Sequence, residues 1–311
     1  MKIKKALNKA ENEQETRERV FPVKPADPDR RHGIPGKTPW QPPVYAESKT
    51  VAIDVNAAVR NHCVALSPAY TEIDYYKVLR TQLRQMDRGA DWKTVMITSV
   101  SPGEGKTVTA INLAATFARE YSQTVLLVDA DLRRQSIHRY LGYASDRGLP
   151  DYLESNVPMR DIMVWPGIDK FAIISGGGVV ADSAELMGSP RMRELVAELK
   201  DRYDDRHVIF DVPPVMGCAD TLAFAPLVDR IILVVGAGQT RQQDLEKALE
   251  MLPQEKVAGF VLNQFNDAKR LYGPYGKGFD HKRSFEEWRR TGVRLKEQLF
   301  CRLFKGRRKE P

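Results

Sequence analysis

The sequence predicts an α/β fold in which a mostly parallel sheet is flanked by helices. Two kinds of segment alternate along the central part of the chain: short apolar runs typical of buried strands, and longer amphipathic runs typical of helices. This alternation is typical of parallel strands joined by right-handed helical crossovers. The predicted strands are 95–98, 125–129, 170–174, 208–211, 230–235 and 256–262, and the clearest helices between them are 109–121, 190–202 and 244–252.

Before this core, residues 1–66 are predicted to form a disordered arm. The first fifty residues contain seven of the nineteen prolines and eighteen charged side chains, with little hydrophobic periodicity. An ordered domain is expected over 67–266. Its first helix is predicted over 71–86, where apolar residues recur at helical spacings of three and four: Ile73, Tyr76, Leu79 and Leu83.

The segment Ser101-Pro-Gly-Glu-Gly-Lys-Thr107 joins a predicted strand to a predicted helix. Glycines allow backbone N–H groups to turn toward a phosphate chain, and a helix N-terminus adds partial positive charge there. This pattern predicts a phosphate-binding loop, although a plain strand–turn–helix corner is the structural alternative. We expect Lys106 to neutralise the β- and γ-phosphates and the Thr107 hydroxyl to bind Mg²⁺. The loop is a variant, because Val100 stands where the standard pattern has glycine.

Carboxylates follow two of the predicted strands. Asp129 and Asp131 end the apolar run that begins at Val125, and Asp211 ends a second run that stops at two prolines. In open α/β sheets the carboxyl ends of the strands face the ligand crevice. Mg²⁺ prefers a few oxygen ligands together with several waters, so Asp131 and Asp211 are predicted to hold it directly or through water. For any one of these acids, a helix cap or turn is the alternative.

Together the segments SPGEGKT, LLVDADLRR and VIFDVPP resemble those of the bacterial tyrosine autokinases of capsule and exopolysaccharide loci, which are relatives of the MinD/ParA P-loop ATPases. The resemblance covers about 67–265. The family's D-x-D-x-R box matches Asp129, Asp131 and Arg133, whereas Val212 stands where the family usually has Ser or Thr.

The resemblance implies ATP and Mg²⁺ as cofactors and assigns roles to further residues. The nucleotide would contact Gly103, Glu104, Gly105, Lys106, Thr107 and Val108. Asp129 would accept the proton of the incoming tyrosine hydroxyl, with Lys106 and Asp131 completing the catalytic group. Arg133 would bind a phosphate or order its loop, unless it forms a surface ion pair. Asn263 would read the adenine edge, unless it is a strand-end turn residue.

The last residues, 267–311, are predicted to form a flexible tyrosine-containing segment and a basic amphipathic tail. Tyr272 and Tyr275 are the phosphoacceptor candidates, although a plain Gly-Tyr loop is the alternative. The tail carries fourteen Lys and Arg against six Asp and Glu. Such a helix suits an anionic membrane surface, a protein partner, packing on its own domain, or solvent. Nucleic acid is not expected, because no binding motif accompanies the charge.

The sequence therefore predicts a tyrosine autokinase that controls polysaccharide synthesis or export. No apolar run is long enough for a membrane span, and the three cysteines have no metal or redox spacing, so a cytoplasmic setting at the inner face of the membrane is expected. The resemblance implies a membrane-embedded adaptor and a ring of subunits. Asp74, Lys77 and Arg80 would form one polar ridge of a helix that helps to hold this ring, and an ordinary solvated helix face is the alternative. The alternatives are a MinD/ParA-like ATPase switch at the membrane and a nucleotide-binding scaffold with little turnover.

Overall fold

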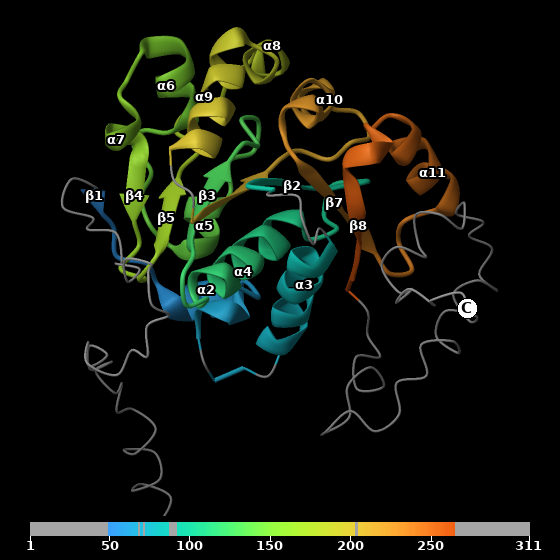
Figure 1. The fold of residues 1–311 in the computed structure, drawn as a ribbon, viewed down its shortest axis with the longest axis horizontal. Coiled ribbons are helices and arrows are strands. Elements are labelled where there is room, and N and C mark those ends of the chain that lie inside the picture. Colours follow the sequence, from blue (N-terminus) through green and yellow to red (C-terminus); the bar gives the residue numbers. More distant parts are fainter. Residues whose placement is uncertain (1–48, 68, 71, 87–91, 203–204, 265–311) are drawn as a thin grey trace, which may run out of the picture. The chain divides into compact units, whose positions relative to one another are not determined.

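An eight-stranded sheet forms the centre of the computed structural model, which describes residues 49–67, 69–70, 72–86, 92–202 and 205–264 (Figure 1). Every neighbouring pair of strands is parallel except β4–β5. In spatial order the strands are β1 (Lys49–Thr50), β4 (Met163–Trp165), β5 (Phe171–Ile174), β3 (Thr124–Asp129), β6 (Arg206–Asp211), β2 (Thr94–Ser99), β7 (Arg230–Gly236) and β8 (Val257–Asn263). The predicted fold class is confirmed.

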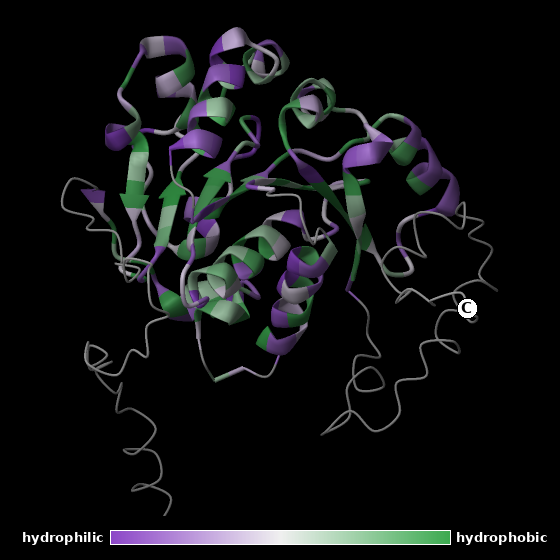
Figure 2. Cartoon of the chain, in the orientation of Figure 1, coloured by the Kyte–Doolittle hydropathy of each residue, from purple (hydrophilic) through white to green (hydrophobic). Residues whose placement is uncertain are grey.

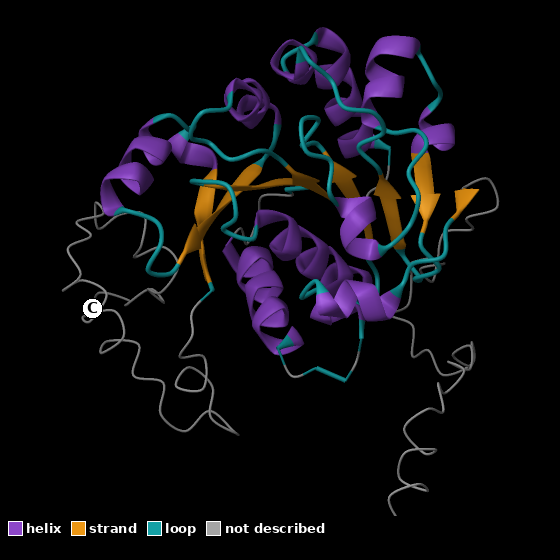
Figure 3. Cartoon of the chain, turned by 180° about the vertical axis from the view of Figure 1, so that it is seen from behind, coloured by secondary structure: helices purple, strands orange, loops and turns teal. Residues whose placement is uncertain are grey.

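Helices cover both faces of the sheet (Figures 1 and 3). One face packs against α2 (Val55–Arg60), α3 (Ile73–Met86), α4 (Lys106–Ala118) and α5 (Ile137–Leu141). The other packs against α6 (Leu149–Ser155), α7 (Met159–Ile162), α8 (Ser183–Met187), α9 (Pro190–Asp201), α10 (Ala219–Phe224) and α11 (Gln242–Glu250). Short 3₁₀ turns lie at Val64–Leu66, Ala225–Leu227 and Gln254–Lys256.

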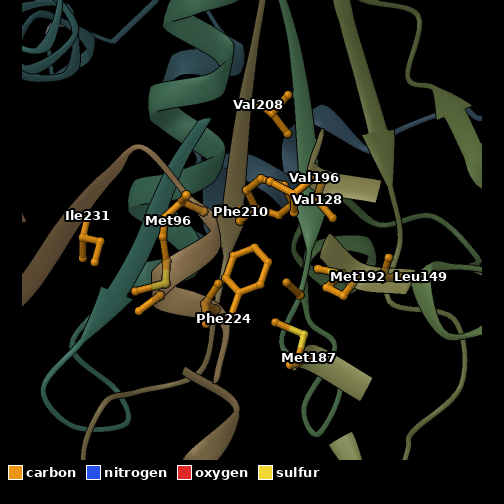
Figure 4. Packing of buried hydrophobic residues seen from close by; sticks show 14 of the residues in the cluster. Met96, Val128, Leu149, Met187, Met192, Val196, Val208, Phe210, Phe224 and Ile231 are labelled. Carbon is orange, nitrogen blue, oxygen red and sulfur yellow. The ribbon is translucent and has the colours of Figure 1, made fainter. Parts of the chain in front are cut away.

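The central strands feed two hydrophobic cores because their side chains alternate between the faces. Met96, Val128 and Phe210 point into the core under α9 and α10 (Figure 4). Their neighbours Ile97 and Ile209 point into the core under α4. In Figure 2 the strands are mostly hydrophobic, whereas α9 and α11 carry hydrophilic stretches on their ribbons. This double coverage explains why the strands read as continuous apolar runs in the sequence.

Helix α4 begins earlier than the sequence predicts. The apolar pattern predicts a helix over 109–121, but α4 spans Lys106–Ala118. Its first turn is made by Lys106 and Thr107, so the end of the phosphate-loop motif is itself helical. Helix α3 agrees with its predicted range, and it buries Ile73 and Leu83.

The predicted arm is wrong for residues 49–66, which belong to the folded domain. Ala58, Cys63 and Ala65 are fully buried. The Ala65 amide donates to Asn112 Oδ1 at 2.8 Å, which ties this segment to the middle of α4. Such contacts join residues far apart in the sequence, so local composition does not reveal them.

The predictions for residues 1–48, for Tyr272 and Tyr275, and for the basic tail lie outside the described residues. Within the described ranges, the structure contains no helix with the length and apolar character of a membrane span.

Candidate functional site

The predicted lysine and two of the predicted carboxylates meet at the ends of neighbouring strands β2, β6 and β3. Lys106 Nζ lies 2.8 Å from Asp131 Oδ2 and 3.2 Å from Asp211 Oδ1. Asp211 is paired in register with Ile97 on one side and Asp129 on the other, so the sheet itself sets these positions. Burial alone would lower the pKa of Lys106, but the charges of Asp211 and Asp131 outweigh it and raise that pKa. The Lys106 side chain therefore stays protonated and positively charged.

The loop before Lys106 has the backbone that phosphate binding requires. Gly103 and Gly105 adopt positive φ angles of 86° and 92°, which favour glycine. A Cβ at Gly105 would lie 2.1 Å from Asn263 Nδ2, so a larger residue does not fit without a shift. No described residue accepts a hydrogen bond from the amides of 103–107. These donors sit at the N-terminus of α4 and suit an anion.

Hydroxyl and carboxylate oxygens surround the position next to Lys106. Thr107 Oγ1 donates to Asp211 Oδ2 at 2.6 Å and lies 3.3 Å from Ser136 Oγ. Burial is the main cause that raises the pKa of Asp211, opposed by the charge of Lys106. A nearby cation stabilises the ionised form of a buried carboxyl such as that of Asp211. Oxygen donors of this kind fit a hard divalent ion such as Mg²⁺.

Asp129 lies deeper than Asp131. Its Oδ2 accepts hydrogen bonds from the amides of Ser136 and Ile137 at 2.9 and 3.0 Å. Its Oδ1 is buried and has no hydrogen-bond partner among the described residues. Burial, followed by the charge of Asp211, raises the pKa of Asp129 to about 7. One carboxylate oxygen of Asp129 is therefore held by backbone amides, and the other has no hydrogen-bond partner among the described residues. Asp131, in contrast, lines the cavity.

Arg133 forms the ion pair that the sequence left as the alternative to phosphate binding. Its NH2 lies 3.0 Å from Asp220 Oδ1, and its Nε donates to Ser183 Oγ at 2.9 Å. Burial would raise the pKa of Asp220, but hydrogen bonds from Ser183 and Cys218 and the charge of Arg133 outweigh it and hold that pKa below its usual value. Arg133 still lines the cavity.

Behind the phosphate loop lies a brace that the sequence reading did not identify, formed by Glu104, Thr240, Asn263 and Gln264. Glu104 is buried, and its carboxylate accepts hydrogen bonds from the Ser101 amide and the Thr240 hydroxyl. The side chains of Asn263 and Gln264 donate to the carbonyls of Glu104 and Gly103, each at 2.8 Å. The available signal in the sequence was the polar residues near the ends of two strands: Asn263 ends β8, Gln264 follows it, and Thr240 lies four positions after β7.

This placement bears on the predicted adenine contact of Asn263. The side-chain amide is occupied by the loop carbonyl, and Asn263 is not among the residues that line the cavity. Val108 also lies outside that lining, one turn into α4. The roles of both residues in nucleotide binding stay predictions.

The cavity itself has a volume of about 1150 Å³ and two charged walls. We call residues 102–107 the loop wall and residues 133–140 the α5 wall. Asn61 and Asp131 also line the cavity, together with apolar and small residues: Gly177, Val179, Pro213, Pro214, Met216, Gly217 and Cys218. This volume lies slightly above the roughly 300–1,000 Å³ that is typical of pockets for drug-sized ligands.

Comparison with known proteins shows which family the chain resembles. The model of the CobQ/CobB/MinD/ParA nucleotide binding domain matches residues 95–272. Tyrosine-protein kinase YwqD of Bacillus subtilis is 33% identical over 220 residues, which cover 70% of this chain and 92% of YwqD. The chain belongs to the bacterial tyrosine-protein kinases of this nucleotide-binding family.

Two further relatives of this kinase family support the assignment. Tyrosine-protein kinase CpsD of Streptococcus agalactiae is 30% identical over 206 residues, which cover 65% of this chain and 88% of CpsD. The solved kinase domain of the Escherichia coli tyrosine kinase ETK superposes with a TM-score of 0.61 at 28% identity, over 71% of this chain and 90% of that domain. The sequence-based resemblance is confirmed.

Proposed function

We propose that this protein transfers the γ-phosphoryl group of ATP to protein tyrosines, including its own. The observation that carries the proposal is the meeting of Lys106, Asp131 and Asp211 below a loop of uncommitted amides, in a chain that spans 92% of a related tyrosine kinase. Phosphoryl transfer needs mainly positioning and charge neutralisation. The site offers both.

In this proposal the loop wall binds the phosphates. The amides of 103–107 and Lys106 contact the β- and γ-phosphates, so Lys106 exchanges its carboxylate partners for phosphate oxygens. Thr107, Asp131 and Asp211 are the residues that would hold Mg²⁺. When bound, the ion neutralises charge that develops on the phosphates.

Asp129 is the proposed proton acceptor for the tyrosine hydroxyl. A pKa near 7 suits a general base at neutral pH, and its Oδ1 has no competing partner among the described residues. Asp131 lies closer to the cavity but is paired with Lys106 at 2.8 Å. Replacing each by Asn separates the two roles: loss of Asp129 should lower kcat, and loss of Asp131 should also weaken Mg²⁺ dependence.

The biological setting is proposed from the resemblance. We infer a regulatory role in exopolysaccharide or capsule synthesis, at the inner face of the membrane and together with a membrane-embedded adaptor. Assembly into a homo-oligomer would let one subunit present Tyr272 or Tyr275 to the next. Within α3, Lys77 pairs with Asp74 at 2.7 Å, whereas Arg80 turns to Glu120 at 2.8 Å. The ridge predicted from these residues is therefore partly committed inside one subunit.

The second candidate is an ATPase switch without kinase activity, which the family of the domain also permits. Incubation of the full chain with Mg²⁺ and ATP, followed by mass spectrometry, separates the two. Phosphate on tyrosine supports the kinase. ATP hydrolysis with no phosphotyrosine on the chain or on added tyrosine peptides would reject the kinase and support the switch.

A further inference from the structure

The α5 wall of the cavity carries positive charge that the nucleotide chemistry described above does not use. Arg134 and Arg139 both line the cavity, and both are exposed. Neither lies within ion-pair distance of a carboxylate in the described ranges of the chain. Arg133, by contrast, is matched by Asp220. Two guanidinium groups on this wall therefore face the cavity without a local counter-charge.

One of these groups is held in place. Arg139 donates from Nε to the Gln135 carbonyl at 3.1 Å, and from NH2 to the carbonyls of Arg134 and Gln135, each at 2.6 Å. These bonds leave its other terminal nitrogen uncommitted. Because carbonyls carry no net charge, they orient the guanidinium without neutralising it. Arginine in such a fixed geometry is suited to a carboxylate or phosphate partner.

Apolar side chains line the same cavity. Val179 is 76% exposed in the loop after β5, and Met216 follows the two prolines after β6. A large hydrophobic side chain left exposed at a cavity is available to pack against a ligand. An aromatic ring with a polar tip is such a ligand. The cavity thus offers apolar contact for a tyrosine ring and positive charge for the groups beside it.

We infer that the α5 wall is an acceptor subsite that selects tyrosine peptides with carboxylates beside the tyrosine. The inference rests on the proposed kinase function and adds a substrate class to it. The inference also makes the chain's own segment a weaker substrate than an acidic one, because the charged residues nearest Tyr272 and Tyr275 are Lys269, Arg270 and Lys277, and the acids Asp267 and Asp280 each lie five positions away. An acidic segment of another protein fits the wall better than this segment does.

Direct binding tests the inference without requiring catalysis. Fluorescein-labelled peptides with one central tyrosine, flanked by glutamates or by lysines, are titrated with the full chain in Mg²⁺ and a non-hydrolysable ATP analogue. We expect the acidic peptide to bind about tenfold more tightly at low salt, and the ratio to shrink at high salt.

The basic tail also attracts acidic peptides, so the decisive comparison is between variants that share the tail. Arg134→Gln should weaken the acidic peptide roughly threefold to fivefold, and Arg134→Glu should reduce the acidic-to-basic ratio to about one or below. Arg134 is the safer position, since its guanidinium forms no hydrogen bond or ion pair with a described residue, whereas Arg139 bonds the carbonyls of Arg134 and Gln135 just before α5. Arg160→Gln, at an exposed side chain of α7, is the matched control and should keep the wild-type ratio.

The outcomes separate this inference from the proposed function. An unchanged peptide ratio in Arg134→Glu overturns the inference, even if tyrosine phosphorylation proceeds. A ratio that falls as expected supports the subsite, even if no phosphoryl transfer is detected and the kinase proposal fails. In the active enzyme the same variant should raise the KM of the acidic peptide more than it changes kcat.

Discussion

The two walls of the cavity hold positive charge in opposite ways. On the loop wall, Lys106 is largely buried and lies between Asp131 and Asp211, and the loop before it is braced by Glu104 and Thr240. On the α5 wall, Arg134 and Arg139 are exposed and have no described carboxylate partner. A buried charge must be paired and hydrogen-bonded to offset its loss of hydration, whereas an exposed arginine without a carboxylate partner can form an ion pair with a ligand.

This difference teaches which functions each wall can serve. The loop wall is largely preorganised, because the Thr107 hydroxyl and the Asp211 carboxylate hold each other in place, and Lys106 has only to exchange its carboxylate partners for phosphate oxygens in the proposed complex. Such preorganisation is what phosphoryl transfer exploits. The α5 wall suits recognition, since weaker and more exposed charges discriminate between partners without fixing the chemistry. Among changes at the site, we expect the effect to decrease from Lys106 to Asp129 to Thr240.

Removing the buried cation should have the largest effect. Lys106→Met takes the positive charge from the phosphates and leaves Asp131 and Asp211 to repel them. We expect kcat/KM for ATP-dependent phosphorylation to fall about 10³-fold. Lys49→Met is the matched control, because Lys49 forms only an exposed ion pair with Asp146. Comparable initial rates of ADP release from Lys106→Met and wild type would contradict the assignment of the site.

Asp129, a fully buried acid of the site, should control how stability depends on pH. In the metal-free, nucleotide-free protein, the pKa of Asp129 is about 7, above the ordinary carboxyl value of about 3.9. Between these values the folded state binds more protons than the unfolded state, so the free energy of unfolding falls as pH rises from 4 to 7. Each pH unit in this range lowers the free energy of unfolding by up to about 1.4 kcal/mol.

Asp129→Asn should flatten this decline, since the amide does not titrate. Urea unfolding in EDTA at pH 5 and at pH 8 measures the difference in the free energy of unfolding between the two pH values. Asp161→Asn, at an exposed carboxylate, is the control. A pH dependence identical to that of the wild type would show that Asp129 is not the proton-binding group.

The brace behind the loop should have the smallest effect. Thr240→Val keeps the shape of the side chain but removes the hydroxyl that accepts from the Gly236 amide and donates to Glu104. A buried carboxylate that loses a donor costs about 1–2 kcal/mol. Because Glu104 is part of the loop, we expect ATP affinity to weaken roughly fivefold to tenfold.

Fluorescence titration with a labelled ATP analogue measures the affinity of the brace variant. Thr81→Val is the matched control, because the Thr81 hydroxyl donates to the Lys77 carbonyl at an exposed position of α3. If Thr240→Val lost stability but kept wild-type affinity, the brace would support the fold and not the loop.

The sequence predicts the loop wall well, because its signals are local. The glycine turn with Lys106, and the strands that end at Asp129 and Asp211, are short patterns whose spacing follows from the strand–loop–helix layout. Asp131 is placed by the same strand. The convergence of these residues then follows from the parallel sheet.

The parts that the sequence did not reveal depend on contacts between distant residues. Glu104 and Thr240 are 136 positions apart, and Arg133 meets Asp220 only because the loops after β3 and β6 lie side by side. Residues 49–66 contain short, weakly apolar elements whose burial is set by α4. Such pairings become visible only after the sheet order is known.

Isothermal titration of ATP, with Mg²⁺ and then with EDTA, tests the central claim most directly. If a magnesium–triphosphate pair binds between Lys106, Asp131 and Asp211, Mg²⁺ should tighten ATP binding at least about tenfold in the wild type. In Asp211→Asn the same addition should change the affinity by less than about threefold. An equal response to Mg²⁺ in both proteins would contradict the account.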